Sequence, residues 1–154
     1  DHYVIDGDKL KINSFVIQVV YLPGHTLGHN AYWFAEQSWL FSGDVLFGLG
    51  CGRLFEGSYD MAFDSLQKIK SLPAETQIYC THEYTETNLL FCKSLARIEN
   101  PDFENYQVEL KHKRQLNCPS VPLKLSTEKK VNPFLLAKNL EEFTKLRILR
   151  NQFQ

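Results

Sequence analysis

Short apolar and β-branched runs separated by polar turns dominate the first half of the chain, and this pattern predicts β-strands. The run at 15–22 is almost continuously apolar, which is typical of a strand that is buried on both faces. Glu36 and Gln37 supply a polar hairpin turn between two further runs. The predicted strands cover residues 9–12, 15–22, 29–35, 38–46 and 77–80.

Helical spacing of apolar residues first appears after a glycine-rich loop at 48–53 and dominates after residue 84. Ser58 or Asp60 is the expected cap of the first helix, which ends before Pro73. Three later helices are expected from Thr85 to before Asn100, from about Asp102, and over 140–152, whereas 118–135, with its three prolines, is expected to be irregular.

The change of pattern predicts two domains with a boundary near residues 84–90. Residues 1–86 would form an α/β part, and residues 87–154 a small helical domain. The chain has 154 residues and is 44% hydrophobic, enough for a real core. It lacks an initiating methionine and enters strand-like sequence almost at once, so we expect the protein to begin upstream.

Charge distribution and cysteine spacing indicate which ligands and which cellular compartment to expect. Residues 1–108 contain 7 Lys and Arg against 14 Asp and Glu, whereas residues 109–154 contain 10 against 4. A basic end on an acidic body indicates either an anionic ligand or an ordinary solvated lysine-rich face. The four cysteines show no CxxC spacing, which favours a reducing compartment and thiols that are buried or half-buried. No apolar run approaches membrane-spanning length.

The segment PGHTLGH, residues 23–29, places His25 and His29 on one tight turn directly after a predicted strand. Neutral imidazole is a common metal ligand, and glycine allows the close backbone approach that a metal site needs. An HxxxH turn by itself is equally typical of a protein surface. Asp44 follows the apolar run at 39–41, and His82 follows the predicted strand at 77–80. Three strand ends would thus present a nitrogen and oxygen donor set that suits zinc or iron.

Five motifs in this order, over essentially the whole chain, resemble the second half of the glyoxalase II family, the hydroxyacylglutathione hydrolases of the metallo-β-lactamase superfamily. They are PGHTLGH, LFSGDVLF, GCGRLFEG, YCTHEY and EKKVNPFLL. The resemblance implies the second half of an αβ/βα sandwich with a two-metal cleft, followed by a small all-helical domain that holds glutathione. It also implies a cytoplasmic or mitochondrial matrix enzyme and no nucleic-acid or membrane partner.

By position in these motifs, His25 matches a ligand of the first metal, Asp44 the carboxylate that bridges both metals, and His82 a ligand of the second. His29 matches a loop-supporting histidine rather than a ligand. The two divalent ions would be zinc, with iron or manganese as alternatives. The implied reaction is the hydrolysis of S-D-lactoylglutathione to D-lactate and glutathione by a metal-bound hydroxide. Asp44 is therefore also the expected catalytic residue.

The same resemblance assigns five residues to the glutathione part of the substrate. Phe55 stands where the family often has tyrosine, which removes one hydroxyl from the expected contacts. Arg147 and Arg150 lie three apart, on one helix face, and match a basic pair that receives the glycine carboxylate. The full set of predicted substrate-binding residues is Arg53, Phe55, Tyr84, Arg147 and Arg150.

The superfamily signature HxHxDH, which supplies the other metal ligands, is absent from this sequence. Each metal would therefore retain only two ligands, fewer than the three that are usual in catalytic sites. We expect the chain to be the C-terminal portion of a glyoxalase II, inactive without the N-terminal segment of the same protein. The alternatives are a glutathione persulfide dioxygenase-like relative and a non-catalytic fragment that binds glutathione conjugates.

Overall fold

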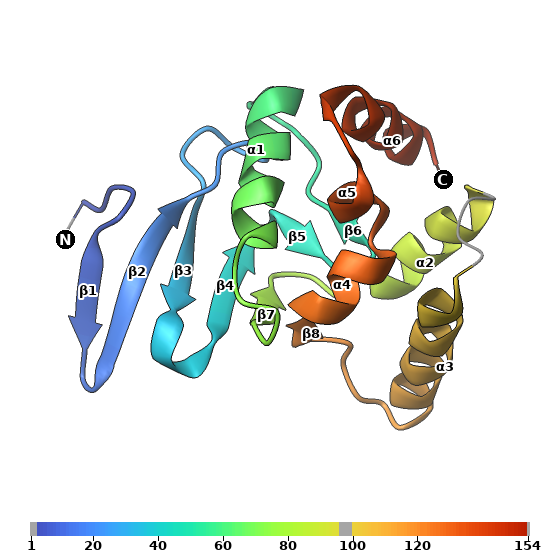
Figure 1. The fold of residues 1–154 in the computed structure, drawn as a ribbon, viewed down its shortest axis with the longest axis horizontal. Coiled ribbons are helices and arrows are strands. Elements are labelled where there is room, and N and C mark those ends of the chain that lie inside the picture. The colour runs from blue at the N-terminus through green and yellow to red at the C-terminus, as the bar shows by residue number, and fades with distance from the viewer. Residues whose placement is uncertain (1–2, 96–99, 154) are drawn as a thin grey trace.

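The computed structural model describes residues 3–95 and 100–153. Its main sheet has the strand order β1-β2-β3-β4-β7-β8 (Figure 1). Neighbouring strands are antiparallel except β4 and β7, which run parallel. These six strands are β1 (Lys9–Ile12), β2 (Phe15–Tyr21), β3 (Asn30–Phe34), β4 (Trp39–Gly43), β7 (Gln77–Cys80) and β8 (Leu123–Lys124).

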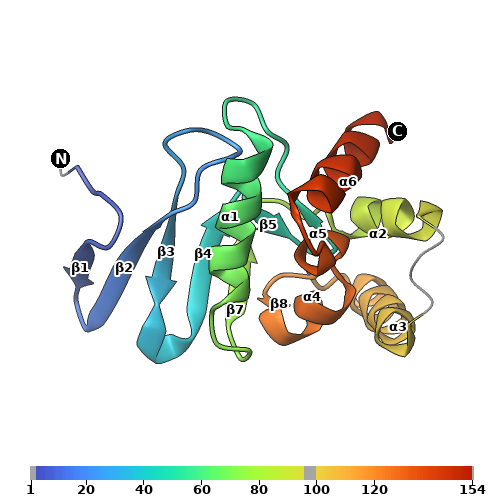
Figure 2. The ribbon, with the colours of Figure 1, turned by 45° about the horizontal axis from the view of Figure 1, so that its top comes forward.

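Two further strands form a separate small hairpin, and a 3-10 turn, η1 (Ala35–Gln37), connects β3 to β4. The hairpin consists of β5 (Leu46–Phe47) and β6 (Gly50–Cys51), which pair antiparallel. It lies between the main sheet and the C-terminal helices (Figure 2). The hairpin is therefore in a position to contact both parts of the chain.

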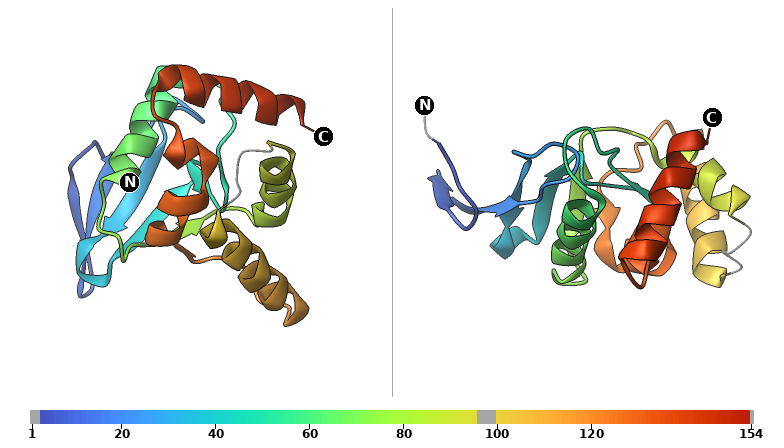
Figure 3. Two further views of the ribbon diagram at one scale, coloured as in Figure 1. Left: turned by 45° about the vertical axis from the view of Figure 1, so that its right-hand side comes forward. Right: turned by 90° about the horizontal axis from the view of Figure 1, so that it is seen from above.

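Helix α1 (Tyr59–Lys70) crosses one face of the main sheet between the parallel strands β4 and β7 (Figures 1 and 3). Such a crossover is needed because parallel strands cannot be joined by a tight turn. Its buried Leu66 and Ile69 contribute to the same core as Leu40 and Ile78 of the sheet. The remaining helices are α2 (Thr85–Ser94), α3 (Pro101–Gln115), α4 (Leu125–Val131), α5 (Pro133–Leu136) and α6 (Leu140–Gln152).

A single hydrophobic core joins the two predicted domains. The ring of Phe63 in α1 packs against Phe143 in α6 with 5.7 Å between centroids, and Phe143 also meets the buried Phe134 of α5. The C-terminal helices are therefore packed onto the sheet–helix layer rather than tethered to it. The boundary between residues 86 and 87 stays a prediction.

The opposite face of the main sheet carries many aromatic side chains that remain accessible. Tyr32 and Phe41 are 39% and 40% exposed, and Phe41 stacks on Tyr79 at 4.9 Å. Residues of β2 accordingly alternate in exposure, so the prediction that this strand is buried on both faces is wrong for the described structure. The reason is that α1 covers only one face, and the second face offers apolar surface for a further layer.

The predicted elements agree with the observed ones for most of the chain, with three corrections. The predicted strand at 38–46 is split, because Gly43 adopts a left-handed φ of 55° that turns the chain after β4. Thr85 lies inside α2, whose N-cap is Tyr84; the predicted end of this helix falls on residues 96–99, outside the described part. The segment 118–135 is not irregular, since it forms β8 and two short helices that tertiary packing stabilises.

All four cysteines are free thiols, as their spacing predicted. Cys92 is buried and Cys51 and Cys80 are half-buried, whereas Cys118 is exposed, contrary to the expectation of buried or half-buried thiols. Cys118 lies in the connection between α3 and β8, where residues 116–119 are all exposed.

The fully buried Glu128 of α4 forms a polar network with Asn132, four residues further on, and with groups from two distant segments. Its Oε2 accepts hydrogen bonds from the Leu49 backbone N–H at 2.9 Å and from Asn132 Nδ2 at 3.0 Å, and its Oε1 accepts one from the Tyr106 hydroxyl at 2.8 Å. Burial raises the pKa of this carboxyl from 4.5 to about 6, although the hydrogen bonds from Leu49, Tyr106 and Asn132 oppose the shift.

The raised pKa of Glu128 predicts a loss of stability as pH rises through the interval from 4.5 to 6. In this window the unfolded chain releases its proton before the native state does, so the free energy of unfolding falls by about 2 kcal/mol. Glu128→Gln cannot titrate and is expected to lack this component. Urea unfolding of both proteins between pH 4 and about 7 measures the difference; parallel pH dependences of the two would contradict the assignment.

Candidate metal centre and substrate cavity

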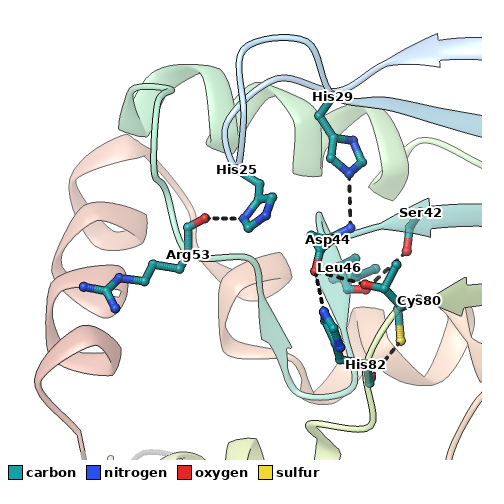
Figure 4. Close-up of polar contacts among 9 residues, drawn as sticks. His25, His29, Ser42, Asp44, Leu46, Arg53, Cys80 and His82 are labelled. Carbon is teal, nitrogen blue, oxygen red and sulfur yellow. Dashed lines mark hydrogen bonds and ion pairs between the residues drawn. The ribbon is translucent and has the colours of Figure 1, made fainter.

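Three loops that follow strands bring His25, Asp44 and His82 to one place in the fold (Figure 4). His25 follows β2, Asp44 follows β4, and His82 follows β7. The turn at Gly43 directs Asp44 toward β7, and a Cβ atom at this position would stand only 2.6 Å from the His29 ring. The local chain geometry therefore requires glycine before the aspartate.

The Asp44 carboxylate is held by two groups from the loop after β7. His82 Nε2 lies 3.2 Å from Asp44 Oδ1, and the Thr81 hydroxyl donates a hydrogen bond to the same oxygen at 3.0 Å. A second anchor holds the backbone, because the Asp44 N–H donates to His29 Nε2 at 3.1 Å. Asp44 is thus oriented through both its side chain and its main chain.

The two histidines of PGHTLGH have different hydrogen-bond partners and hence different chemical capacities. His25 Nδ1 lies 2.8 Å from the Arg53 carbonyl oxygen. Since a carbonyl can only accept, Nδ1 carries the proton and Nε2 retains a lone pair for a metal. In His29 the Nε2 lone pair accepts the Asp44 N–H, so this nitrogen is not free to bind a metal. Burial, reinforced by His25, lowers the pKa of His29 and keeps it neutral.

Two imidazoles and a carboxylate fit a divalent transition metal by the chemistry of their donor atoms. Within residues 3–95 and 100–153, however, no three His, Cys, Asp or Glu side chains come close enough together to enclose an ion. The described residues therefore offer a partial donor set.

All eight predicted site residues line a single cavity of about 550 Å³. Its wall combines the three metal-donor candidates with residues of β5, β6, the loop after β6, α2 and α6. This size lies within the range of small-molecule binding sites. The predicted residues in its wall are His25, Arg53, Phe55, Asp44, His82, Tyr84, Arg147 and Arg150.

Aromatic contacts fix the middle of the cavity. Tyr84 stacks on His82 with 4.9 Å between ring centroids, and the buried Phe47 packs against both rings. Phe55 meets His25 edge-on at 5.1 Å and lies 5.7 Å from the Arg53 guanidinium. Phe55 is 68% exposed, so its ring is accessible to a ligand.

Arg147 and Arg150 are not an equivalent pair. Arg147 is only 4% exposed, and its Nη1 donates to the carbonyl oxygens of Cys51 at 2.7 Å and Gly52 at 3.4 Å. Arg150 donates from Nε to Asn88 Oδ1 at 3.2 Å and is more accessible. Arg147 therefore anchors the loop after β6, and Arg150 retains its terminal nitrogens for an anion.

Several cavity residues were not predicted, and most of them lack a signal that sequence reasoning can detect. Phe47 and Asn88 line the cavity as buried residues of a strand and a helix, positions that sequence assigns to packing. Thr81 precedes His82 in the sequence, which is the only indication of its contact with Asp44. The Cys51 thiol also lines the cavity, and burial raises its pKa, so it stays protonated and no thiolate nucleophile is available.

Glu83 has a role that its position beside His82 in the sequence does not indicate. Its carboxylate accepts hydrogen bonds from the Ser120 hydroxyl and from the Ser120 N–H, the latter at 2.8 Å. Ser120 in turn bonds to the buried Thr85 hydroxyl at 2.7 Å. Glu83 therefore ties the loop that carries His82 to the segment before β8, rather than orienting the imidazole or forming an ion pair.

Comparisons with known proteins agree with this geometry. Residues 2–82 match the model of the metallo-beta-lactamase superfamily, and residues 83–153 match that of the hydroxyacylglutathione hydrolase C-terminus. The chain is 54% identical, over 99% of its length, to a hydroxyacylglutathione hydrolase from Bdellovibrio bacteriovorus, and 46% identical over 89% to one from Rhodospirillum rubrum. It covers 63% and 53% of those proteins, so it spans between half and two thirds of their length.

Solved structures show the same fold at lower identity. The crystal structure of ETHE1 from Myxococcus xanthus gives a TM-score of 0.66 at 26% identity, covering 98% of this chain and 52% of that one. The BLEG-1 B3 metallo-beta-lactamase gives 0.59 at 26% identity, covering 88% and 48%. The chain belongs to the metallo-β-lactamase superfamily. Its residues 83–153 are similar, within that superfamily, to the C-terminus of the hydroxyacylglutathione hydrolases. None of the helices in the described part of the chain has the length and apolar character to cross a membrane.

Proposed function

We propose that the protein to which this chain belongs hydrolyses S-D-lactoylglutathione, and related 2-hydroxyacylglutathione thioesters, to the hydroxy acid and glutathione. The observation that carries this proposal is the single cavity that joins metal-donor side chains to aromatic and guanidinium groups. A thioester of glutathione has matching chemistry, because its reactive carbonyl is polar and its peptide part carries carboxylates. The relatives named hydroxyacylglutathione hydrolase support the same assignment.

Each residue has a defined task in this proposal. His25, Asp44 and His82 would hold divalent metal ions, zinc in the first instance, with iron or manganese as alternatives. The bound metals supply water activation near neutral pH and positive charge for the developing oxyanion. His29 and Thr81 hold Asp44 in place through hydrogen bonds. The Arg53 carbonyl accepts from His25 Nδ1, which leaves the lone pair of His25 on Nε2.

Other side chains in the cavity wall would bind and orient glutathione. Tyr84 and Phe55 provide aromatic surface, and Arg53 and Arg150 provide guanidinium groups for carboxylates. Arg147 keeps the loop after β6 in position through two carbonyl oxygens. Holding the peptide part in this way presents the thioester carbonyl to the metal ions and lowers the entropic part of the barrier.

We further propose that the remaining metal ligands, and a second layer over the open aromatic face of the main sheet, come from an N-terminal segment of the same protein. The partial donor set and the accessible Tyr32 and Phe41 support this division. The four free thiols favour a cytoplasmic location.

The proposal predicts that residues 1–154 alone do not hydrolyse S-D-lactoylglutathione at a measurable rate, whereas the full-length protein does. The experiment measures thioester loss for both proteins with zinc, iron or manganese added, and oxygen consumption with glutathione persulfide serves as the alternative reaction. Metal-dependent turnover by the 154-residue chain would contradict the division of ligands. If the full-length protein consumed oxygen but did not hydrolyse the thioester, its function would be that of a persulfide dioxygenase instead of a hydrolase.

A further inference from the structure

In the chain, the β5–β6 hairpin connects a candidate metal donor to a candidate substrate-binding residue of the cavity. Asp44 lies just before it in the chain, and Arg53 lies just after it. Phe47, on the first strand of the hairpin, packs against Tyr84 at 5.1 Å and against His82 at 6.1 Å between ring centroids. The hairpin therefore determines where these two rings stand relative to one another.

Side chains from the C-terminal helices hold this hairpin by its main chain. Asn132 Nδ2 donates to the carbonyl oxygens of Phe47 and Gly50, both at 3.1 Å, and Glu128 Oε2 accepts the Leu49 N–H at 2.9 Å. Glu128 Oε2 also accepts from Asn132 Nδ2 at 3.0 Å, which joins the two residues into one unit. Leu49 adopts a left-handed φ of 58°, a conformation that non-glycine residues rarely take.

Glu128 and Asn132 are both completely buried, and complete burial is unusual for a carboxylate. Burying a charge costs free energy, and an apolar side chain of similar size would often stabilise such a position at least as well. Among the described residues, every hydrogen bond from these two side chains to the main chain of a distant segment goes to the hairpin. The polar pair thus specifies the hairpin conformation rather than adding to the packing of α4.

We propose that Glu128 and Asn132, from the EKKVNPF motif, are positioning residues that act through Phe47 to preorganise Tyr84 and His82 for binding of the glutathione part of the substrate. This inference rests on the proposed function for the identity of the ligand. The structural part of the inference is that the Phe47–Tyr84 contact depends on Glu128 and Asn132. This part does not depend on the proposed function.

Asn132→Ser tests the inference while keeping the N-cap of α5, and urea unfolding measures what the lost Nδ2 hydrogen bonds cost in stability. Serine is a good N-cap and can still accept the Phe134 N–H that Asn132 Oδ1 now accepts at 3.1 Å, but it is too short to reach the hairpin carbonyls. In the full-length protein, we expect the nuclear Overhauser effect between the Phe47 and Tyr84 rings to weaken. The Kd for reduced glutathione is expected to rise about tenfold, and KM for the thioester to rise more than kcat falls.

Glu128→Gln is the matched conservative variant. Its amide oxygen can still accept from Leu49 and Asn132, and its NH₂ can donate to the Tyr106 oxygen, so the ring contact and the Kd are expected to match the parent protein. Glu128→Met removes these contacts while keeping the side-chain length, and should reproduce the effect of Asn132→Ser.

Unchanged ring contact and glutathione Kd in Asn132→Ser would overturn the proposal, as would equal losses in Glu128→Gln and Glu128→Met. If the ring contact responds as expected but the parent protein itself does not bind glutathione, the positioning role stands and the proposed function fails. The two failures are therefore distinguishable.

Discussion

Asp44→Asn in the full-length protein is expected to reduce the rate of S-D-lactoylglutathione hydrolysis by about a thousandfold or more, which corresponds to about 4 kcal/mol of transition-state stabilisation. Asparagine keeps the size of the side chain and can accept the Thr81 hydrogen bond with its carbonyl oxygen, but it loses the negative charge and one of two metal-binding oxygens. Because Asp44 would help to hold the divalent metal ions, the variant should bind them more weakly.

The measurement combines steady-state kinetics with metal analysis of the purified variant. Asp64→Asn is the control, since Asp64 lies exposed on α1, remote from the candidate site in the chain and absent from the cavity wall. The control should retain the activity and metal content of the parent protein. An Asp44→Asn variant with unaltered metal content and rate would remove Asp44 from the catalytic centre.

Arg147→Ala and Arg150→Ala are expected to separate stability from substrate binding. Arg147→Ala leaves the Cys51 and Gly52 carbonyls without their buried donor and removes a guanidinium that lies 5.3 Å from the Phe134 ring centroid. We expect it to lower the free energy of unfolding by about 3 kcal/mol. Arg150→Ala loses one hydrogen bond, to Asn88, and contacts with the Phe91 and Phe153 rings at 5.7 and 5.8 Å. Because no main-chain carbonyl loses its donor, we expect a smaller loss of about 1 kcal/mol.

For substrate binding, Arg150→Ala is expected to have the more specific effect of the two variants. Arg150→Ala is expected to raise KM by about tenfold with kcat nearly constant. It removes the positive charge that would pair with a ligand carboxylate, and it does not move the loop after β6. Urea unfolding and steady-state kinetics of both variants provide the comparison. A large stability loss in Arg150→Ala together with a small one in Arg147→Ala would show that the two roles are assigned to the wrong residues.

The candidate metal donors were predictable because each follows a short apolar run that ends at a turn. PGHTLGH, SGD and THE stand at the carboxyl ends of β2, β4 and β7, and because these strands run in the same direction, the three ends lie along one edge of the main sheet. The same reasoning did not reveal Thr81 or Asn88, since a threonine beside a histidine and an asparagine in a helix have no distinguishing local pattern. Their contacts join residues 37 and 40 positions apart in the chain, to Asp44 and Gly48 respectively.

The segment 118–135 shows why local patterns fail for short elements. Prolines and the absence of a long apolar period predict an irregular segment, yet α4 and α5 form there with seven and four residues. Helices this short are unstable by themselves and depend on burial of Leu125, Val131 and Phe134 in the common core. The information that stabilises them lies in distant strands and helices.

By itself, the sequence determined most strands, the long helices, the three metal-donor candidates and the family to which the chain is similar, because these features depend on local periodicity and on motifs whose residues lie close together in the chain. Only the tertiary structure decided that Arg147 anchors a loop while Arg150 stays available, that Glu128 and Asn132 hold the β5–β6 hairpin, and that one sheet face remains open. These outcomes depend on hydrogen bonds and packing between segments about 60 to 100 residues apart, and the cost of leaving a buried polar group unpaired selects the partners.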